Sequence, residues 1–269
     1  MNLPVCETLE LQVDDFTLNI RLNRPDVRNA MSLQMTEELM AVFAAIHDSR
    51  DIRAVVLRGN GGHFCAGGDI KDMATARMQA AQSGNGDAYA TLNRAFGKMI
   101  TQVDQAPQVV IAALEGAVLG GGFGLACVSD VAITLHSTMF GLPETGLGVI
   151  PAQIAPFVVK RIGLTQARAL ALLGSRFDGE EAKRLGIVHR VVTSNGDLNS
   201  AIVEVLLQVQ RCAPEANRVT KALLHRVGNE PLESLLDDAA QQFAQAVSSA
   251  EGAEGTMAFV QKRPPKWAE

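Results

Sequence analysis

The sequence is poor in aromatic residues, in cysteine and in net positive charge, and each shortage excludes a class of protein. Aromatic side chains make up only 4% of the 269 residues, so a hydrophobic core must rest mainly on Ala, Val, Leu and Ile. The formal net charge is −5, whereas a general nucleic-acid-binding protein is basic. The four cysteines follow no CxxC spacing, so we expect free thiols in a reducing compartment rather than a disulfide framework.

The chain also lacks the features of a membrane or secreted protein. No apolar stretch reaches the roughly 20 residues needed to cross a bilayer. The first residues carry neither the basic nor the apolar region of a secretory signal. The remaining composition, 47% hydrophobic and 20% charged, is typical of a globular protein. We therefore expect a cytoplasmic protein of one large domain, or of one domain with an appendage, with no membrane or nucleic-acid partner.

Hydrophobic periodicity predicts strands mixed with helices, followed by a part that is mainly helical. The predicted strands cover Phe16–Leu22, Ala54–Leu57, Val109–Leu114, Asp130–Leu135 and Val188–Val192. Ser32 is placed to cap a helix, and Pro214 and Pro231 are placed to begin two later helices. A helical pattern between residues 69 and 105 is interrupted at 83–86. This order indicates an α/β protein with a helical C-terminal part.

A run of three glycines, Gly120–Gly122, follows one predicted strand and leads into a predicted short helix. Glycine allows a backbone N–H to come close to a ligand because it has no Cβ. Further along, the carboxylate of Glu144 stands among the small or apolar residues Phe140–Pro143. Thioester enolate chemistry needs a hydrogen-bond donor for the developing oxyanion and a group that moves a proton. The two motifs together indicate such chemistry.

Five stretches, in this order, resemble the crotonase (enoyl-CoA hydratase/isomerase) superfamily. They are Leu22–Ala30 (LNRPDVRNA), Phe64–Ile70 (FCAGGDI), Val110–Gly122 (VIAALEGAVLGGG), Phe140–Pro151 (FGLPETGLGVIP) and Phe259–Arg263 (FVQKR). The resemblance implies an α/β fold in which a spiral of ββα repeats occupies residues 1–200. A helical region over residues 201–269 would drive assembly into a homotrimer, or into a hexamer as a dimer of trimers. The resemblance also implies an acyl-CoA substrate and no metal or redox cofactor.

The same resemblance implies roles for individual residues. The backbone N–H groups of Ala66 and Gly121 would form the oxyanion hole, and Glu144 would be the catalytic carboxylate. The implied contacts to the CoA ester are Arg28 and Lys71 at the phosphates, Ala30 at the pantetheine, Ala66, Gly67, Gly68, Asp69 and Ile70 around the adenine, Gly121, Gly122 and Gly124 in the glycine segment, and Lys262 at the nucleotide.

The sequence departs from the superfamily at Gly124, where two-glutamate hydratases carry their first glutamate. The stretch Ala152–Pro156 also differs from the glycine-rich segment usual after this proline. Both departures resemble the bacterial methylglutaconyl-CoA and isohexenylglutaconyl-CoA hydratases of leucine and acyclic-terpene breakdown. We therefore expect hydration of a branched glutaconyl-type acyl-CoA, with the space freed at Gly124 admitting the 3-substituent. Arg94 and Lys98 are candidates to bind the distal carboxylate of such a substrate.

Three other interpretations stay open. The chain could be a Δ3,Δ2-enoyl-CoA isomerase that uses Glu144 alone, another acyl-CoA lyase or hydrolase, or a non-catalytic acyl-CoA-binding relative. His63, His136 and His189 show no metal-ligand spacing, so we expect structural or solvated roles for them. We expect Cys65 to be a small buried thiol.

Overall fold

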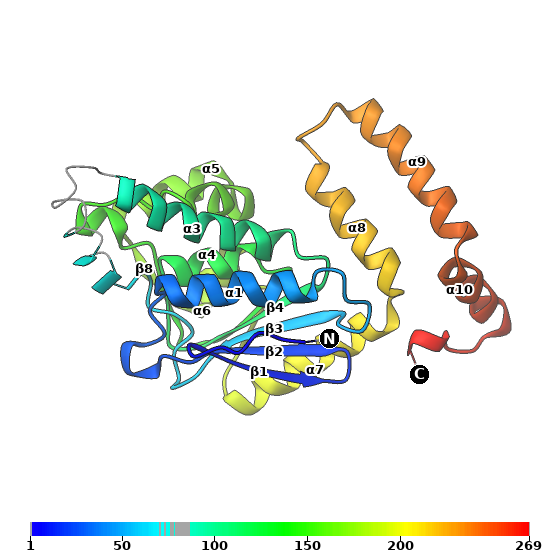
Figure 1. The fold of residues 1–269 in the computed structure, drawn as a ribbon, viewed down its shortest axis with the longest axis horizontal. Helices are drawn as coiled ribbons and strands as arrows, with labels where there is room; N and C mark the ends of the chain where they lie inside the picture. The colour runs from blue at the N-terminus through cyan, green and yellow to red at the C-terminus, as the bar shows by residue number, and fades with distance from the viewer. Residues whose placement is uncertain (1, 70, 73, 76–77, 79–86, 269) are drawn as a thin grey trace. The chain divides into compact units, whose positions relative to one another are not determined.

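Two β-sheets form the framework of the N-terminal part of the chain (Figure 1). The computed structural model describes residues 2–69, 71–72, 74–75, 78 and 87–268. Contacts between Cα atoms divide the chain into two compact units, Met1–Ile202 and Val203–Glu269. Each unit is described by itself.

The larger sheet has six strands in the order β1-β2-β3-β4-β6-β9. Its strands are β1 (Leu9–Asp14), β2 (Thr17–Leu22), β3 (Ala54–Gly59), β4 (Val109–Leu114), β6 (Val131–Leu135) and β9 (Arg190–Val192). Strand β1 is antiparallel to β2, and all the other neighbours are parallel. Strands β3 and β4 are almost entirely buried, as expected for parallel strands covered on both faces.

The smaller sheet has the order β5-β7-β8, and its strands are β5 (Ala117–Leu119), β7 (Met139–Gly141) and β8 (Arg176–Phe177). The chain passes from β4 to β5 and then into helix α4 (Gly121–Val128), and later from β6 to β7 and then toward α5 (Ala155–Leu173). Two earlier turns use single bridging residues in place of the second strand. Met31 pairs with Gly68, and Cys65 pairs with Val118. This repeated passage is the predicted spiral of ββα units, and the α/β fold class is confirmed.

The helices of the repeats pack against one another in sequence. Helix α1 (Leu33–Ile46) contacts α3 (Asp87–Asp104), α3 contacts α4, and α4 contacts α5. Figure 1 shows them stacked on one side of the six-stranded sheet. Ser32 caps α1 as predicted, because its hydroxyl oxygen accepts the N–H of Met35 at 3.1 Å.

An aromatic cluster packs α4 against the smaller sheet. The rings of Phe123 and Phe140 meet edge to face at 6.5 Å between centroids, and Phe177 stacks on Phe140 at 5.7 Å. Phe123 and Phe140 are fully buried. Because the chain has few aromatic residues, this cluster is a concentrated packing anchor, and it fixes where the first turn of α4 lies.

The remaining helical elements are η1 (Pro25–Val27), η2 (Glu144–Leu147), α6 (Gly179–Arg184), α7 (Asn195–Arg211), α8 (Pro214–Arg226), α9 (Leu232–Ser248), α10 (Ala250–Gln261) and η3 (Lys266–Ala268). Pro214 begins α8 and Pro231 caps α9, close to the predicted starts. Within the second unit, Arg263 forms an ion pair with Glu254 at 2.6 Å, and Trp267 donates to the carbonyl of Arg211. In the described part of the chain, no helix combines the length and apolar character needed to span a bilayer.

Candidate active site

The glycine segment turns sharply at Gly120, between strand β5 and helix α4. Its φ of 49° and ψ of −115° are strained for any residue that carries a Cβ. A Cβ there would also lie only 3.0 Å from Oε1 of Glu144 and 3.4 Å from the Cα of Gly67. Glycine is therefore required here, and its lack of a side chain brings the carboxylate of Glu144 close to two stretches of bare backbone.

Gly121 is the first residue of α4 and is only partly buried. The N–H of a first helical residue has no carbonyl partner within its own helix. The positive end of the helix dipole favours negative charge at the same place. The amide of Gly121 is therefore suited to stabilise an oxyanion, as the sequence predicted.

Glu144 begins η2 and points a carboxylate into an apolar environment. Its Oε2 atom is buried and has no hydrogen-bond partner among the described residues. The neighbouring Phe140 and Leu142 are 0% and 1% exposed. This burial raises the pKa of Glu144 above its ordinary value of 4.5. A carboxylate that exchanges protons more readily near neutral pH is suited to act as an acid and a base.

The loop that faces this carboxylate is held by a parallel bridge. The N–H of Met31 donates to the carbonyl of Gly67 at 2.8 Å, and the N–H of Asp69 donates to the carbonyl of Met31 at 3.0 Å. The residue between them, Gly68, directs its own N–H to the opposite side, because neighbouring amides alternate in direction along a bridged strand. Within the described residues no hydrogen-bond partner of that N–H is recorded, and Gly68 is exposed.

The structure corrects the prediction for Ala66. Its N–H donates to the carbonyl of Arg28 at 3.0 Å, so this amide holds two loops together. An amide committed in this way is not available to an oxyanion. Among the described residues Gly68 supplies the uncommitted amide of the same loop, and it becomes the candidate for the oxyanion role predicted for Ala66.

The sequence analysis missed an ion pair that holds the loop of Gly67–Asp69 in place. Arg24 Nη2 lies 2.7 Å from Oδ2 of Asp69, which is only 7% exposed. Arg24 also donates to the carbonyl of Ala30 at 2.6 Å, and Oδ1 of Asp69 accepts the N–H of Lys71 at 2.8 Å. Asp69, Ala30 and Lys71 were predicted to contact CoA, and Arg24 joins all three into one unit. Its place within the LNRPDVRNA motif was the signal available in the sequence.

Asn29 is a second residue that the sequence analysis did not single out. It is fully buried and has a left-handed backbone, with φ of 56°. Its side-chain Oδ1 accepts the backbone N–H of Arg24. Its side-chain Nδ2 donates to the backbone carbonyls of Asn60 at 2.9 Å and His63 at 2.7 Å. This side chain therefore ties its own loop to the turn that carries Asn60 and His63.

The other predicted contact residues divide into three groups. Arg28 and Lys71 are exposed, as ligands to phosphate would need to be. Lys262 is exposed at the C-terminal cap of α10, in the second unit. Gly122 is buried, and a Cβ there would lie 2.7 Å from the Cβ of Cys65. Ile70 lies outside the described residues.

The structure also corrects the expectation of free space at Gly124. The residue is buried, and a Cβ there would lie 2.5 Å from Cγ2 of Ile154 and 2.8 Å from Cδ1 of Ile100. Both isoleucines are core residues, at 3% and 0% exposure. The space left by the missing side chain is therefore filled by two apolar side chains.

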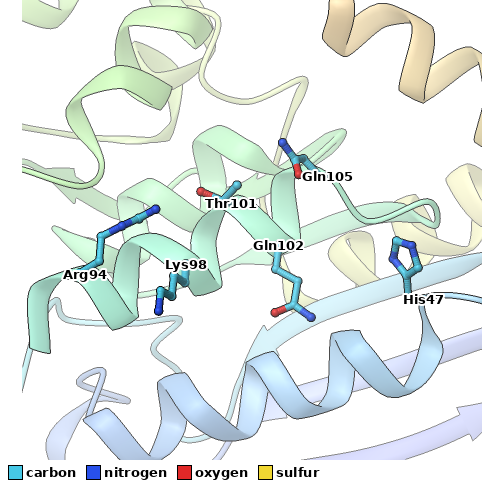
Figure 2. Close-up of a pocket in the computed structure, with 6 residues that line it drawn as sticks. All are labelled: His47, Arg94, Lys98, Thr101, Gln102 and Gln105. Carbon is cyan, nitrogen blue, oxygen red and sulfur yellow. The ribbon is translucent and has the colours of Figure 1, made fainter. Parts of the chain in front are cut away.

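Arg94 and Lys98, the candidates for a distal carboxylate, line a groove along α3 of about 260 Å³ (Figure 2). Its lining residues are His47, Arg94, Lys98, Thr101, Gln102 and Gln105. Lys98 projects from α3 toward α1 in this view. Arg94 donates to Oε1 of Gln153 at 3.3 Å, so it reaches the segment that leads to Ile154. Neither residue is seen to contact Glu144.

His63 and His189 make structural contacts. Nδ1 of His63 accepts the N–H of Ala117 at 3.1 Å, and Nδ1 of His189 accepts the N–H of Ala132 at 3.0 Å. Burial lowers the pKa of His189 below its ordinary value of 6.5. Across the described residues, no three His, Cys, Asp or Glu side chains come together in a way that could hold a metal ion.

Both the sequence and the fold resemble those of known proteins. The sequence profile of the enoyl-CoA hydratase/isomerase family matches residues 15–269. Pseudomonas aeruginosa AtuE has a solved structure that superposes with a TM-score of 0.95 at 60% sequence identity, covering 98% of this chain and 100% of that one. An enoyl-CoA hydratase/isomerase from Marinobacter aquaeolei superposes with a TM-score of 0.94 at 62% identity, with the same coverage.

A more distant relative is also an enoyl-CoA hydratase by its name. The probable enoyl-CoA hydratase echA8 of Mycobacterium bovis is 32% identical over 262 residues, covering 97% of this chain and 98% of its own length. The match extends over nearly the whole of both chains, so it includes the loops that carry Gly68, Gly121 and Glu144.

Proposed function

The chain belongs to the enoyl-CoA hydratase/isomerase family as a hydratase-type lyase, and we propose that its substrate is a branched glutaconyl-type acyl-CoA, such as 3-methylglutaconyl-CoA or isohexenylglutaconyl-CoA. The product is a 3-hydroxyacyl-CoA. The observation that carries the proposed chemistry is the carboxylate of Glu144, which lies beside the bare backbone of Gly120 and Gly67 and whose buried Oε2 has no hydrogen-bond partner among the described residues. The branched substrate class is supported by the sequence resemblance at Gly124 and Ala152–Pro156.

In the proposed reaction, the thioester carbonyl oxygen accepts hydrogen bonds from the N–H groups of Gly68 and Gly121. Ionised Glu144 takes a proton from water while the water oxygen forms a bond to C3. The π electrons of the double bond move toward the thioester carbonyl, whose oxygen becomes enolate-like. Glu144 then returns the proton to C2, so that one water molecule is added and no other reactant is consumed. Removal of one such oxyanion donor typically costs about 3 kcal/mol of barrier.

The proposed CoA contacts follow the corrected geometry. Arg28 and Lys71 lie on the exposed side of the loops that Arg24 holds in place, and we place the phosphates there. Ala30, Gly67 and Asp69 border the pantetheine and adenine. The family implies an acyl-CoA ligand, and local cations of this kind let an acidic protein bind a polyanion.

We also propose that the helical C-terminal region assembles the chain into a trimer or a hexamer. In the second unit several large apolar side chains are exposed, including Phe243 at 71%, Phe259 at 85% and Val260 at 77%. Exposed apolar side chains in such number are typical of association surfaces. Sedimentation equilibrium should give a mass of three or six chains, and a monomer at micromolar concentration would contradict this proposal.

The decisive assay measures reversible loss of enoyl-thioester absorbance with each glutaconyl ester, and the gain of one water by mass spectrometry. AtuE is the natural reference enzyme in the same assay. Glu144→Gln should lower kcat by at least about a hundredfold. The wild-type rate should fall as the pH drops through the raised pKa of Glu144, since the base must be ionised. A variant that keeps half of the wild-type kcat would remove Glu144 from the mechanism.

One observation favours a second candidate, the Δ3,Δ2-enoyl-CoA isomerase. Within the described residues Glu144 is the single carboxylate seen beside Gly120, and an isomerase needs one group to carry a proton between carbons. Formation of a shifted double bond without a mass increase would support the isomerase and contradict the hydratase. Binding of the esters without either change would favour the non-catalytic relative.

A further inference from the structure

Three apolar side chains form a wall over the first turn of α4. Gly121 and Gly124 lie three residues apart, so they share one face of the helix. A Cβ at Gly121 would lie 3.1 Å from the ring of Phe96, and a Cβ at Gly124 would lie 2.5 Å from Ile154 and 2.8 Å from Ile100. Phe96 and Ile100 project from α3, while Ile154 comes from the segment before α5. We call Phe96, Ile100 and Ile154 the acyl wall.

The two glycines differ in their accessibility. Gly121, whose N–H has no carbonyl partner within its own helix, is only partly buried, whereas Gly124 is completely covered. An acyl group whose carbonyl oxygen is held at Gly121 would extend along this face of α4 toward the place where Ile154 covers Gly124. The wall is apolar throughout, so it selects by size and shape rather than by hydrogen bonding.

Ile154 is held from two directions. The preceding Gln153 donates through Nε2 to Oδ1 of Asn93 at 2.9 Å and accepts from Arg94 at 3.3 Å, so it is tied to α3. The side chain of Gln153 also sits against Gly97, where any Cβ would collide with it. On the other side, Ile154 caps α5, and its carbonyl accepts the N–H of Val158 at 3.0 Å. A side chain fixed in this way has little freedom to move away from Gly124.

We propose that Ile154 sets the depth of the acyl pocket and so determines which acyl-CoA esters the enzyme accepts, with Gln153 as the residue that positions it. This rests on the proposed function in one respect, because it places the thioester oxygen at Gly121. Shortening Ile154 opens room beside Gly124 that a larger 3-substituent can fill. A pocket bounded by an apolar side chain discriminates by a factor of about 10 to 200 per methylene.

The test compares wild type, Ile154→Ala and the control Ile187→Ala. Ile187 is also buried, at 0% exposure, but lies between α6 and β9 and is not among the atoms nearest to a Cβ at Gly121 or Gly124. The measured quantity is the ratio of kcat/KM for isohexenylglutaconyl-CoA to that for crotonyl-CoA, which lacks the branch. Ile154→Ala should raise this ratio by about tenfold or more, while Ile187→Ala should leave it unchanged. An unchanged ratio in folded Ile154→Ala overturns the proposal.

A measurement of ligand affinity tests the inference separately from the proposed function. If the wild type hydrates neither ester, the proposed function fails, and the same ratio is then taken from the Kd values of butyryl-CoA and a 3-branched saturated acyl-CoA. A larger relative affinity for the branched ester in Ile154→Ala supports the wall, and an unchanged relative affinity overturns it.

A milder variant and a positioning variant complete the design. If Ile154→Ala does not fold, Ile154→Val removes one methyl group and should shift the ratio about threefold or more in the same direction. Gln153→Ala should shift the ratio as Ile154→Ala does, but less, because it loosens the side chain without removing it. A merely structural role for Gln153 would lower stability and leave the ratio unchanged, and that result would remove Gln153 from the proposal.

Discussion

Replacing Arg24 by Ala tests the ion pair that holds the loop of Gly68. Arg24 reaches Asp69 at 2.7 Å and the carbonyl of Ala30 at 2.6 Å, and Asp69 in turn accepts the N–H of Lys71. The truncation leaves a buried carboxylate that still accepts the N–H of Lys71. It also removes a side chain that joins the two loops proposed to bind CoA, so both the stability and the KM should change.

The magnitude follows from burial. Breaking a fully buried ion pair by removing one partner costs about 3–5 kcal/mol. Arg24 keeps 23% of its side-chain exposure, so water screens part of the interaction, and we expect a loss of about 2–3 kcal/mol in the free energy of unfolding at pH 7. This is a large share of the total stability of a typical domain.

The pH dependence gives a sharper test. Burial alone would raise the pKa of Asp69, but the hydrogen bond and charge of Arg24, together with the N–H and charge of Lys71, outweigh it and hold the pKa below its ordinary value of 3.8. A folded-state pKa below the unfolded value supplies stability that is present above pH 3.8 and is lost as the pH falls through the folded-state pKa. The variant lacks the share of this contribution that Arg24 supplies. The stability difference between wild type and Arg24→Ala should therefore be largest at neutral pH and should narrow as the pH falls below about 4.

The assay is urea unfolding followed by circular dichroism at neutral and acidic pH, together with KM for an acyl-CoA ester. The exposed pair of Arg184 with Glu181 is the matched control, and Arg184→Ala should leave the unfolding midpoint nearly unchanged. Equal stability losses for Arg24→Ala at neutral pH and at the acid end would refute the reasoning, since they would show that the charge of Asp69 is not what Arg24 stabilises.

Four further outcomes are expected. Asn29→Ala removes a buried amide that makes three hydrogen bonds and should cost about 2–4 kcal/mol in chemical denaturation, and a loss under about 1 kcal/mol would contradict its role as a tie between loops. Gly124→Ala places a methyl group 2.5 Å from Ile154 and should destabilise by about 1–3 kcal/mol, and the same substitution should cost less when it is made in the Ile154→Ala variant. Lys262→Ala should raise KM at low salt with kcat unchanged, and equal KM values there would show that this residue does not reach the ligand. Burial lowers the pKa of His189 below 6.5, so the unfolded chain binds more protons and the unfolding free energy should fall as the pH drops below 6.5, a slope that His189→Gln should flatten.

Some elements could be predicted from the sequence because the signal lies within their own residues, as an apolar run or as a capping residue. Strand β4 occupies Val109–Leu114 as predicted, and Ser32 caps α1. The predicted strand at Val188–Val192 shortens to Arg190–Val192. The end of an element depends on where its partner strand stops, and the sequence of one strand does not show this.

Strands β5, β7 and β8 were not predicted. Each has two or three residues, which is too short to display a period of two. Their conformation comes from pairing with segments distant in the chain, as when Val118 pairs with both Phe140 and Cys65. Only the folded chain brings those partners together.

Some features of the candidate site could likewise be predicted from the sequence, and others could not. The apolar neighbours of Glu144 are close in sequence, so its burial could be anticipated. The assignment of the amide at Ala66 failed because a shift of two residues along a bridge decides which amides are already bonded. The expectation of a void at Gly124 failed because the side chain that fills it, Ile154, comes from thirty residues further along the chain. A deleted side chain indicates that space exists, but not what occupies it.

The four thiols provide an internal probe of how the site opens. Cys65 and Cys127 are buried, and burial raises their pKa values to about 11 and about 12, while Cys6 is partly buried and Cys212 is exposed. Since the thiolate is the form that alkylates, reagents at neutral pH modify Cys212 in the folded protein and reach Cys65 only when its bridge to Val118 separates. The alkylation rate of Cys65, measured with and without a CoA ester, therefore reports how often the loop that carries Gly68 opens locally.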